Sequence, residues 1–173
     1  PLDLFEYNPD LKFDLIVSAR TLQWLSNPKE ALIKMKSLLK PNGQISILDY
    51  DHTNLIWNPL PPESMQEFYK TFLKWRQDAG MNNKIAEDLP ELLKDAGFHS
   101  IEKINSDEVY KREDLDFKSK IGIWSKVAGS TQMVKEGYLE NDLRLKAIEE
   151  YDNWIENSAF SMTMKLNEVR GKV

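Results

Sequence analysis

The chain has 173 residues, 41% of them hydrophobic, so a single domain with a substantial core is expected. Its 28 acidic and 23 basic residues give a net charge of -5, with both signs interspersed. Nucleic acid is therefore not an expected partner, because phosphate binding requires clustered positive charge. No apolar run approaches the roughly 20 residues that cross a bilayer, so no membrane partner is expected either. The lack of cysteine excludes disulfides and thiolate sites and fits a soluble protein of the cytoplasm.

The first part of the chain predicts a strand, a helix and a second strand. FDLIVS, at 13–18, is a short aliphatic run that is typical of a parallel strand covered on both faces. NPKE, at 27–30, is a helix-start signature, and PNG, at 41–43, is expected to end that helix with Gly43 at positive φ. QISILDY, at 44–50, predicts the second strand, parallel to the first across a right-handed crossover.

The rest of the chain predicts helices followed by extended segments. Amphipathic helices are expected from 61 to near Gly80 and from 86 to 96, followed by extended chain over 98–110. Residues 114–157 predict further helices, which we interpret as an insertion or cap within the single domain, 1–173. The last segment alternates, which predicts an antiparallel strand whose covered face carries Phe160, Met162, Met164 and Leu166.

Polar residues follow both strands of the first part. Ser18 to Trp24 follow the first strand, and Asp49 to Asn54 follow the second. In open α/β sheets, ligands bind at the carboxyl ends of neighbouring strands, which favours a site here. A solvated turn is the alternative for ILDYDH, at 47–52, since Asp, Tyr and Asn are common turn residues. The two histidines are too few and too far apart in sequence for a metal site, so no metal is expected.

In order, these segments resemble class I S-adenosylmethionine-dependent methyltransferases. FDLIVS, LQWL, the helix ending in LLKPNG and the strand ending in ILDYD are similar to the fourth and fifth strands of that family and their connection. LPELLKDAGF resembles the helix before the sixth strand, and the last strand resembles the seventh. The resemblance implies an α/β fold with a partial Rossmann-like methyltransferase sheet, its strands equivalent to 4, 5, 6 and 7, with helices on both faces and a helical insertion.

The resemblance also implies that part of the family's domain is missing from this chain. The seven glycines never form the spacing of a cofactor loop. In the family that loop, and the acidic residue that binds the ribose, belong to the N-terminal half. We therefore expect methyl transfer to a small-molecule acceptor by a longer parent protein, and little cofactor binding or activity by this chain alone.

The resemblance implies S-adenosylmethionine as the cofactor and assigns site residues by position. In the family, the end of this second strand faces the methyl acceptor. Methyl transfer needs a base only when the acceptor must lose a proton, and Asp51 and His52 are the residues implied for that catalytic role. The residues implied to bind the cofactor are Ser18, Ala19, Arg20, Gln23 and Trp24. Those assigned to the acceptor are Asp49, Tyr50, Arg76 and Asn83, the last two for an anionic group. LQWL is also similar to a segment of methyltransferases that act on small carboxylic acids.

Two other interpretations compete with methyl transfer. A dehydrogenase or hydrolase is disfavoured because the chain shows neither a dinucleotide fingerprint nor a nucleophile elbow. The alternative from another class is a non-catalytic interaction module that dimerises through the helices of 114–157. An unpaired edge along the first strand would also favour self-association.

Overall fold

The computed structural model describes residues 3–173, which fall into two compact units. The first unit contains the residues up to Thr53, 79–107 and 165–173, and the second contains 54–78 and 108–164. Two long strands, β2 (Leu39–Asn58) and β5 (Ser161–Lys172), contribute residues to both units.

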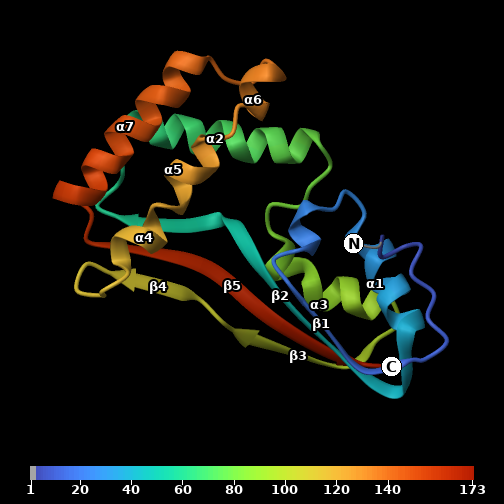
Figure 1. The fold of residues 1–173 in the computed structure, drawn as a ribbon. Coiled ribbons are helices and arrows are strands. Elements are labelled where there is room, and N and C mark those ends of the chain that lie inside the picture. The colour runs from blue at the N-terminus through green and yellow to red at the C-terminus, as the bar shows by residue number, and fades with distance from the viewer. Residues whose placement is uncertain (1–2) are drawn as a thin grey trace. The chain divides into compact units, whose positions relative to one another are not determined.

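The first unit is built on a mixed sheet. Strand β1 (Phe13–Ala19) pairs in parallel with β2, and β3 (His99–Asn105) pairs antiparallel with β5. The strand order is β1-β2-β5-β3, which leaves β1 at an edge (Figure 1). The predicted α/β class and the parallel strand, helix, strand unit are confirmed.

The helices of the first unit form where local sequence signals place them. Helix α1 (Pro28–Leu38) begins after Asn27, whose side chain accepts a hydrogen bond from the Glu30 amide at 3.3 Å. Helix α3 (Ile85–Asp95) lies beside α1 (Figure 1). A 3₁₀ turn, η1 (Leu22–Trp24), precedes α1 in the chain. The fully buried members of their shared core include Leu22, Ala31, Leu32, Ile45, Ile47, Ile85, Leu89, Leu93 and Val169.

The turn after α1 differs from the prediction. Asn42, and not Gly43, takes the left-handed conformation, with φ 64°. Asparagine tolerates this region better than most residues, and it lies where the β1–β2 register shifts between Phe13 and Leu15. Gly43 is required for a different reason, because a Cβ atom there would come 2.9 Å from the Lys40 carbonyl oxygen.

The second strand is also longer than predicted. The sequence suggested that it ends at Tyr50, whereas β2 continues to Asn58. ILDYDH therefore lies inside a strand, and the alternative of a solvated turn was wrong. Asp49, Asp51 and His52 are all buried.

The last strand shows two further differences from the predicted alternation. Met162, Met164 and Leu166 are buried as expected, but Phe160 is 57% exposed because it precedes β5. Asn167 is also buried, although the alternation of the segment puts it on the opposite face, and its side-chain amide donates hydrogen bonds to the Ala86 carbonyl and to the Glu87 carboxylate.

The second unit is mainly helical. Helix α2 (Glu63–Asp78) packs against α7 (Asn141–Asn157), and α7 also contacts α5 (Ile123–Ala128). Two short helices, α4 (Phe117–Ile121) and α6 (Gln132–Lys135), and strand β4 (Glu108–Lys111), antiparallel to β5, complete it. The core includes Met65, Phe68, Phe72, Trp124, Ala147 and Tyr151.

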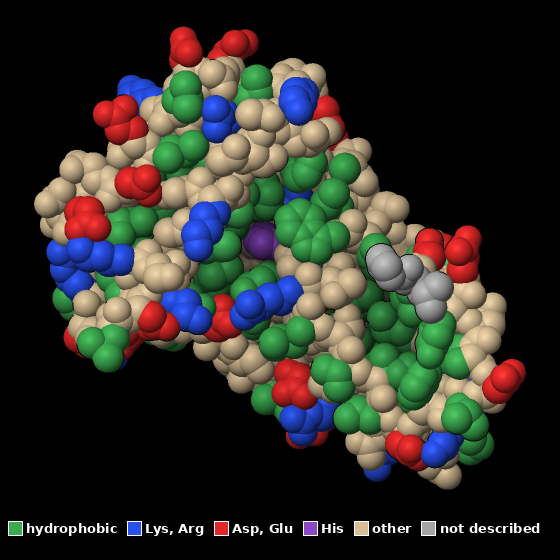
Figure 2. Space-filling model, viewed as in Figure 1, with side chains coloured by type: hydrophobic (Ala, Val, Ile, Leu, Met, Phe, Trp, Pro, Cys, Tyr) green, Lys and Arg blue, Asp and Glu red, His purple; other side chains and the backbone are tan. Residues whose placement is uncertain are grey.

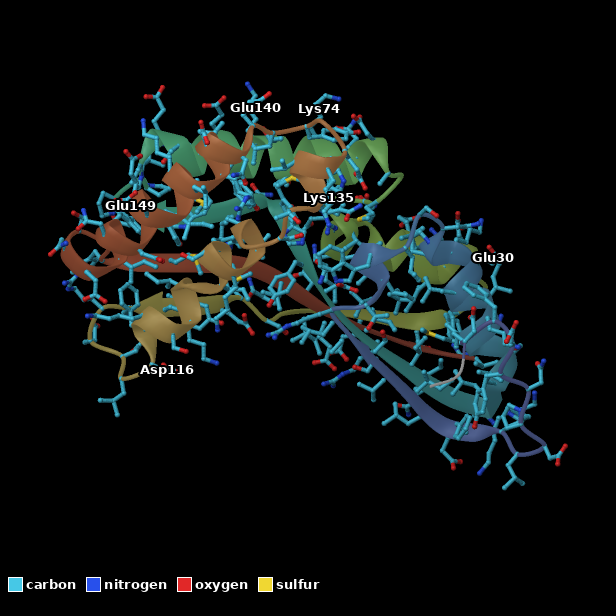
Figure 3. All side chains as sticks on the ribbon, turned by 45° about the horizontal axis from the view of Figure 1, so that its top comes forward. Glu30, Lys74, Asp116, Lys135, Glu140 and Glu149 are labelled. Atoms are coloured by element: carbon cyan, nitrogen blue, oxygen red, sulfur yellow. The ribbon has the colours of Figure 1, made fainter. Side chains whose placement is uncertain are left out.

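Charged side chains cover the outer faces of these helices. Lys74 on α2 and Glu149 on α7 point away from the packed helices (Figure 3). Acidic and basic side chains are interspersed on the face that Figure 2 shows. Within residues 3–173, every helix is too short or too polar to cross a membrane.

Candidate active site

The two polar segments predicted from the sequence meet in the first unit. The chain leaves β1 at Arg20, whose amide donates a hydrogen bond to the Leu48 carbonyl of β2 at 2.7 Å. The amide of Leu22 then donates to the carboxylate of Asp49 at 3.1 Å, in the interior. Asp49 therefore fixes η1 against β2, and through it the segment that carries Gln23 and Trp24.

Ser18, at the end of β1, holds a hydroxyl that has no hydrogen-bond partner among the described residues. Its side chain is only 8% exposed. Leaving a buried polar group unsatisfied costs about 1–3 kcal/mol, so such a group is a candidate for ligand contact. Ala19 is exposed beside it, and Trp24 is 48% exposed.

Gln23 and His52 form a buried polar pair. The Nε2 atom of His52 lies 2.5 Å from Oε1 of Gln23, and the Gln23 Nε2 donates to the Arg20 carbonyl at 3.2 Å. Their exposed fractions are 6% for His52 and 3% for Gln23. The backbone amide of His52 donates to the Asn83 carbonyl at 2.8 Å, which brings residues before α3 to this position.

The Tyr50 ring lies near both a cation and an imidazole. Its ring is 5.5 Å from the His52 ring, centroid to centroid, and the Arg20 guanidinium carbon lies 5.2 Å from its centroid. Arg20 also has φ 57°, a left-handed conformation that is uncommon for a residue with a side chain. Backbone strain of this kind concentrates at functional sites.

Asp51 is buried, and one of its carboxylate oxygens is occupied locally. Oδ1 accepts hydrogen bonds from the Thr53 amide at 2.8 Å and from the Thr53 hydroxyl at 2.6 Å. Its charge also acts on Glu87 of α3. Hydrogen bonds from Lys103 and then Asn167 hold the pKa of Glu87 below its usual value, although burial and the Asp51 charge oppose them.

The structure does not bring every predicted site residue together. Asn83 contributes its backbone to the first unit, whereas Arg76 belongs to the second. Arg76 is fully buried there on α2, with its guanidinium carbon 5.4 Å from the centroid of the Phe72 ring. Sequence reasoning missed Asn167, because its hydrogen bonds to Ala86 and Glu87 join residues far apart in the chain and no local pattern signals them.

Comparisons with known proteins support one family. Residues 2–114 match a family model described as a methyltransferase domain. No curated protein sequence gave a significant match.

Solved structures with a similar fold include methyltransferases. Phosphoethanolamine N-methyltransferase 2 of Haemonchus contortus, in complex with S-adenosyl-L-methionine, is 18% identical with a TM-score of 0.50, over 98% of this chain and 35% of that one. N-methyltransferase NodS of Bradyrhizobium japonicum, in complex with S-adenosyl-L-homocysteine, is 14% identical with a TM-score of 0.44, over 99% of this chain and 51% of that one. At this identity the first likeness supports a shared fold. The chain spans about a third of the length of the Haemonchus structure.

Proposed function

Because this chain belongs to the methyltransferase domain family, we propose that it is part of an S-adenosylmethionine-dependent methyltransferase that acts on a small-molecule acceptor. The observation that carries the proposal is the buried polar cluster where β1 ends beside β2. It includes the unsatisfied Ser18 hydroxyl, the left-handed Arg20 and the Gln23–His52 pair. Clusters at this end of parallel strands are the usual ligand sites of open α/β sheets.

The residues at the end of β1 fit a polar cofactor. When bound, S-adenosylmethionine supplies an electrophilic methyl group on a sulfonium sulfur. We assign the Ser18 hydroxyl and the backbone of Ala19 and Arg20 to its amino acid part, because a ligand would satisfy the Ser18 hydroxyl. The exposed ring of Trp24 offers an apolar surface beside them.

The residues of β2 are assigned to the acceptor side. Asp51 and His52 are the candidate bases, and their burial excludes competing water from a proton transfer. Asp49 acts by holding η1, and the Tyr50 ring supports His52.

An acceptor with an anionic group is proposed on the basis of Arg76. Arg76 is fully buried, and burying a guanidinium has a high desolvation cost that an anionic partner would offset. Asn83 is a separate candidate in the first unit, where its backbone carbonyl accepts a hydrogen bond from the His52 amide.

We further propose that the 173-residue chain is inactive by itself. It contains no glycine spacing that could form a cofactor loop, so the amides that would hold the rest of the cofactor are not supplied by this chain. The functional enzyme would combine it with a strand and a glycine-rich loop.

A transfer assay with methyl-labelled S-adenosylmethionine tests the proposed function. The protein would be a methyltransferase that contains this chain together with a glycine-rich cofactor loop, and the acceptors would be small amines and carboxylic acids, with and without a second anionic group. We expect label transfer to at least one acceptor class. Cofactor binding without transfer to any acceptor, together with dimerisation through the helices of 114–157, would favour the non-catalytic interaction module instead.

A further inference from the structure

We propose that Gln23 is a positioning residue that locks neutral His52 in its Nε2–H tautomer and so makes Nδ1 the proton-accepting atom. The role of Nδ1 as a proton acceptor rests on the proposed methyl transfer, whereas the tautomer of His52 does not depend on it. It replaces the cofactor contact that the sequence assigned to Gln23.

The first step concerns the orientation of the Gln23 amide. One end of the Gln23 side-chain amide lies 3.2 Å from the backbone carbonyl oxygen of Arg20, and a carbonyl oxygen can only accept hydrogen bonds. The NH₂ end of the amide must therefore face Arg20. The opposite orientation would place two oxygen acceptors against each other.

The second step fixes the proton on His52. Once the NH₂ group faces Arg20, the Gln23 oxygen faces Nε2 of His52 at 2.5 Å. An amide oxygen has no proton to give, so Nε2 must carry one. A neutral imidazole has a single N–H, and the basic lone pair then belongs to Nδ1.

The third step shows that the pair is held from both sides. The backbone amide of Arg20 donates a hydrogen bond to the Leu48 carbonyl of β2, and the left-handed conformation of Arg20 directs its own carbonyl. The backbone amide of His52 donates a hydrogen bond to the Asn83 carbonyl, and the Tyr50 ring lies beside the imidazole. Because both partners are almost fully buried, water does not compete for the hydrogen bond.

The chemical consequence is a defined path for the acceptor proton. As the acceptor lone pair forms its bond to the methyl carbon, the N–H or O–H proton of the acceptor passes to Nδ1 of His52. The electron pair of the broken carbon–sulfur bond stays on sulfur. His52 ends as an imidazolium with its Nε2–H still directed at Gln23, so the pair needs no rearrangement during the step.

The test is nitrogen NMR of the 173-residue chain labelled with ¹⁵N-histidine. The chain has only two histidines, and a His99→Gln variant assigns the spectrum. In the neutral form we expect the wild-type His52 to show a protonated Nε2 and an unprotonated Nδ1. A wild-type His52 with the proton on Nδ1 would overturn the proposal.

Two variants separate positioning from general packing. Gln23→Glu keeps an acceptor oxygen and should retain the Nε2–H tautomer, whereas Gln23→Leu removes the acceptor and should give a mixture. Circular dichroism verifies that each variant is folded. If His52 of a folded Gln23→Leu variant shows only the Nε2–H tautomer, then Gln23 does not determine that tautomer.

The same variants in the active enzyme distinguish this inference from the cofactor contact. We expect Gln23→Leu to lower kcat by about 10-fold or more, since a general base contributes at least that much, while the Kd for S-adenosylhomocysteine changes less than about twofold. Loss of cofactor affinity at unchanged kcat would restore the cofactor role. An enzyme without transfer activity would refute the proposed function while leaving the tautomer measurement valid.

Discussion

At the scale of residues, the segment from Asp49 to His52 contains both side chains that stabilise the local structure and a candidate catalytic base. The Asp49 carboxylate holds the amide of Leu22, and the Asp51 carboxylate holds Thr53. His52 differs from both because its ring is oriented by another side chain, that of Gln23. A general base must be correctly oriented as well as basic, so His52 is a stronger candidate for the base than Asp51.

We predict that His52→Ala in the active enzyme lowers kcat by about 10²-fold or more, the usual range for a general base, with little change in cofactor Kd. Steady-state kinetics and calorimetry measure the two quantities. His99→Ala is the matched control, because His99 is exposed and its Nδ1 lies 3.1 Å from the hydroxyl of the neighbouring Ser100. Equal turnover in the two variants would contradict the base assignment.

For Asp51 we predict that charge, and not only hydrogen bonding, matters. Asp51→Asn preserves an oxygen that can accept from Thr53 but removes the negative charge. If Asp51 assists the proton transfer, Asp51→Asn should lower kcat about as much as Asp51→Ala. If kcat of Asp51→Asn equals that of the wild type across the pH range, the Asp51 carboxylate serves only to hold Thr53.

At the scale of elements, β1 is the exposed edge of the sheet of the first unit. Leu15 and Val17 are 54% and 65% exposed, and one side of the strand has no partner among residues 3–173. An apolar edge strand with open backbone groups favours pairing with another chain. We therefore propose that the isolated chain self-associates through β1.

The corresponding prediction is that Val17→Lys reduces association. A charge on an edge strand opposes pairing, so sedimentation velocity should show less concentration-dependent oligomer than in the wild type. Ile33→Lys is the control, since Ile33 is equally apolar and 50% exposed but lies on α1. The same decrease in both variants would mean that association does not use β1.

The end of β3 and the middle of β5 are joined by a partly buried carboxylate. Burial would raise the pKa of Asp107, but hydrogen bonds from Lys165 and the Leu166 amide outweigh it and hold the pKa below its usual value. A lowered folded pKa means that this stabilisation is present above the ordinary pKa of an aspartate and is lost as the pH falls through the folded value.

We therefore predict that Asp107→Asn lowers the free energy of unfolding at pH 7 by about 1–2 kcal/mol, since a charge-assisted bond is removed. The deficit should shrink as the pH falls below the usual aspartate range, because the wild type then loses the same interaction. Urea unfolding across pH measures this. Asp95→Asn, which removes an exposed pair with Lys29, should cost less, and an equal cost would contradict the argument.

Local signals predicted the helices better than the strands. The Asn27 cap and the helical spacing of apolar residues located α1, and the same spacing located α2 and α3. The length of β2 could not be predicted, because its pairing with β1 ends at Leu48, and the polar residues that follow resemble a turn although they stay extended in a strand that neighbours β5. Likewise, the left-handed Asn42 depends on a register shift between two strands.

The site was predictable in its location but not in its contacts. Parallel topology was enough to place Ser18 to Trp24 beside Asp49 to His52. The Gln23–His52 bond and the Asn83 contact join residues about 30 positions apart, and no periodicity encodes them. Arg76, which the sequence assigned to an anionic acceptor, is fully buried on α2, and its role in binding remains a prediction.

At the scale of the whole molecule, the chain supplies a recognisable part of a methyltransferase domain. It covers about a third of the Haemonchus structure, and its sequence has no glycine loop. The single-domain organisation and the cap role of residues 114–157 stay predictions. So do the small-molecule acceptor and the cytoplasmic location.

The most direct test of the account is calorimetric titration with S-adenosylhomocysteine. We expect binding by a longer protein that contains this chain together with a glycine-rich loop, and at least about 100-fold weaker binding by the 173-residue chain, because cofactor affinity depends on loop amides at a helix N-terminus. Absence of binding by the longer protein would contradict cofactor-dependent methyl transfer. Equally tight binding by the 173-residue chain would contradict the division of the site between this chain and a glycine loop.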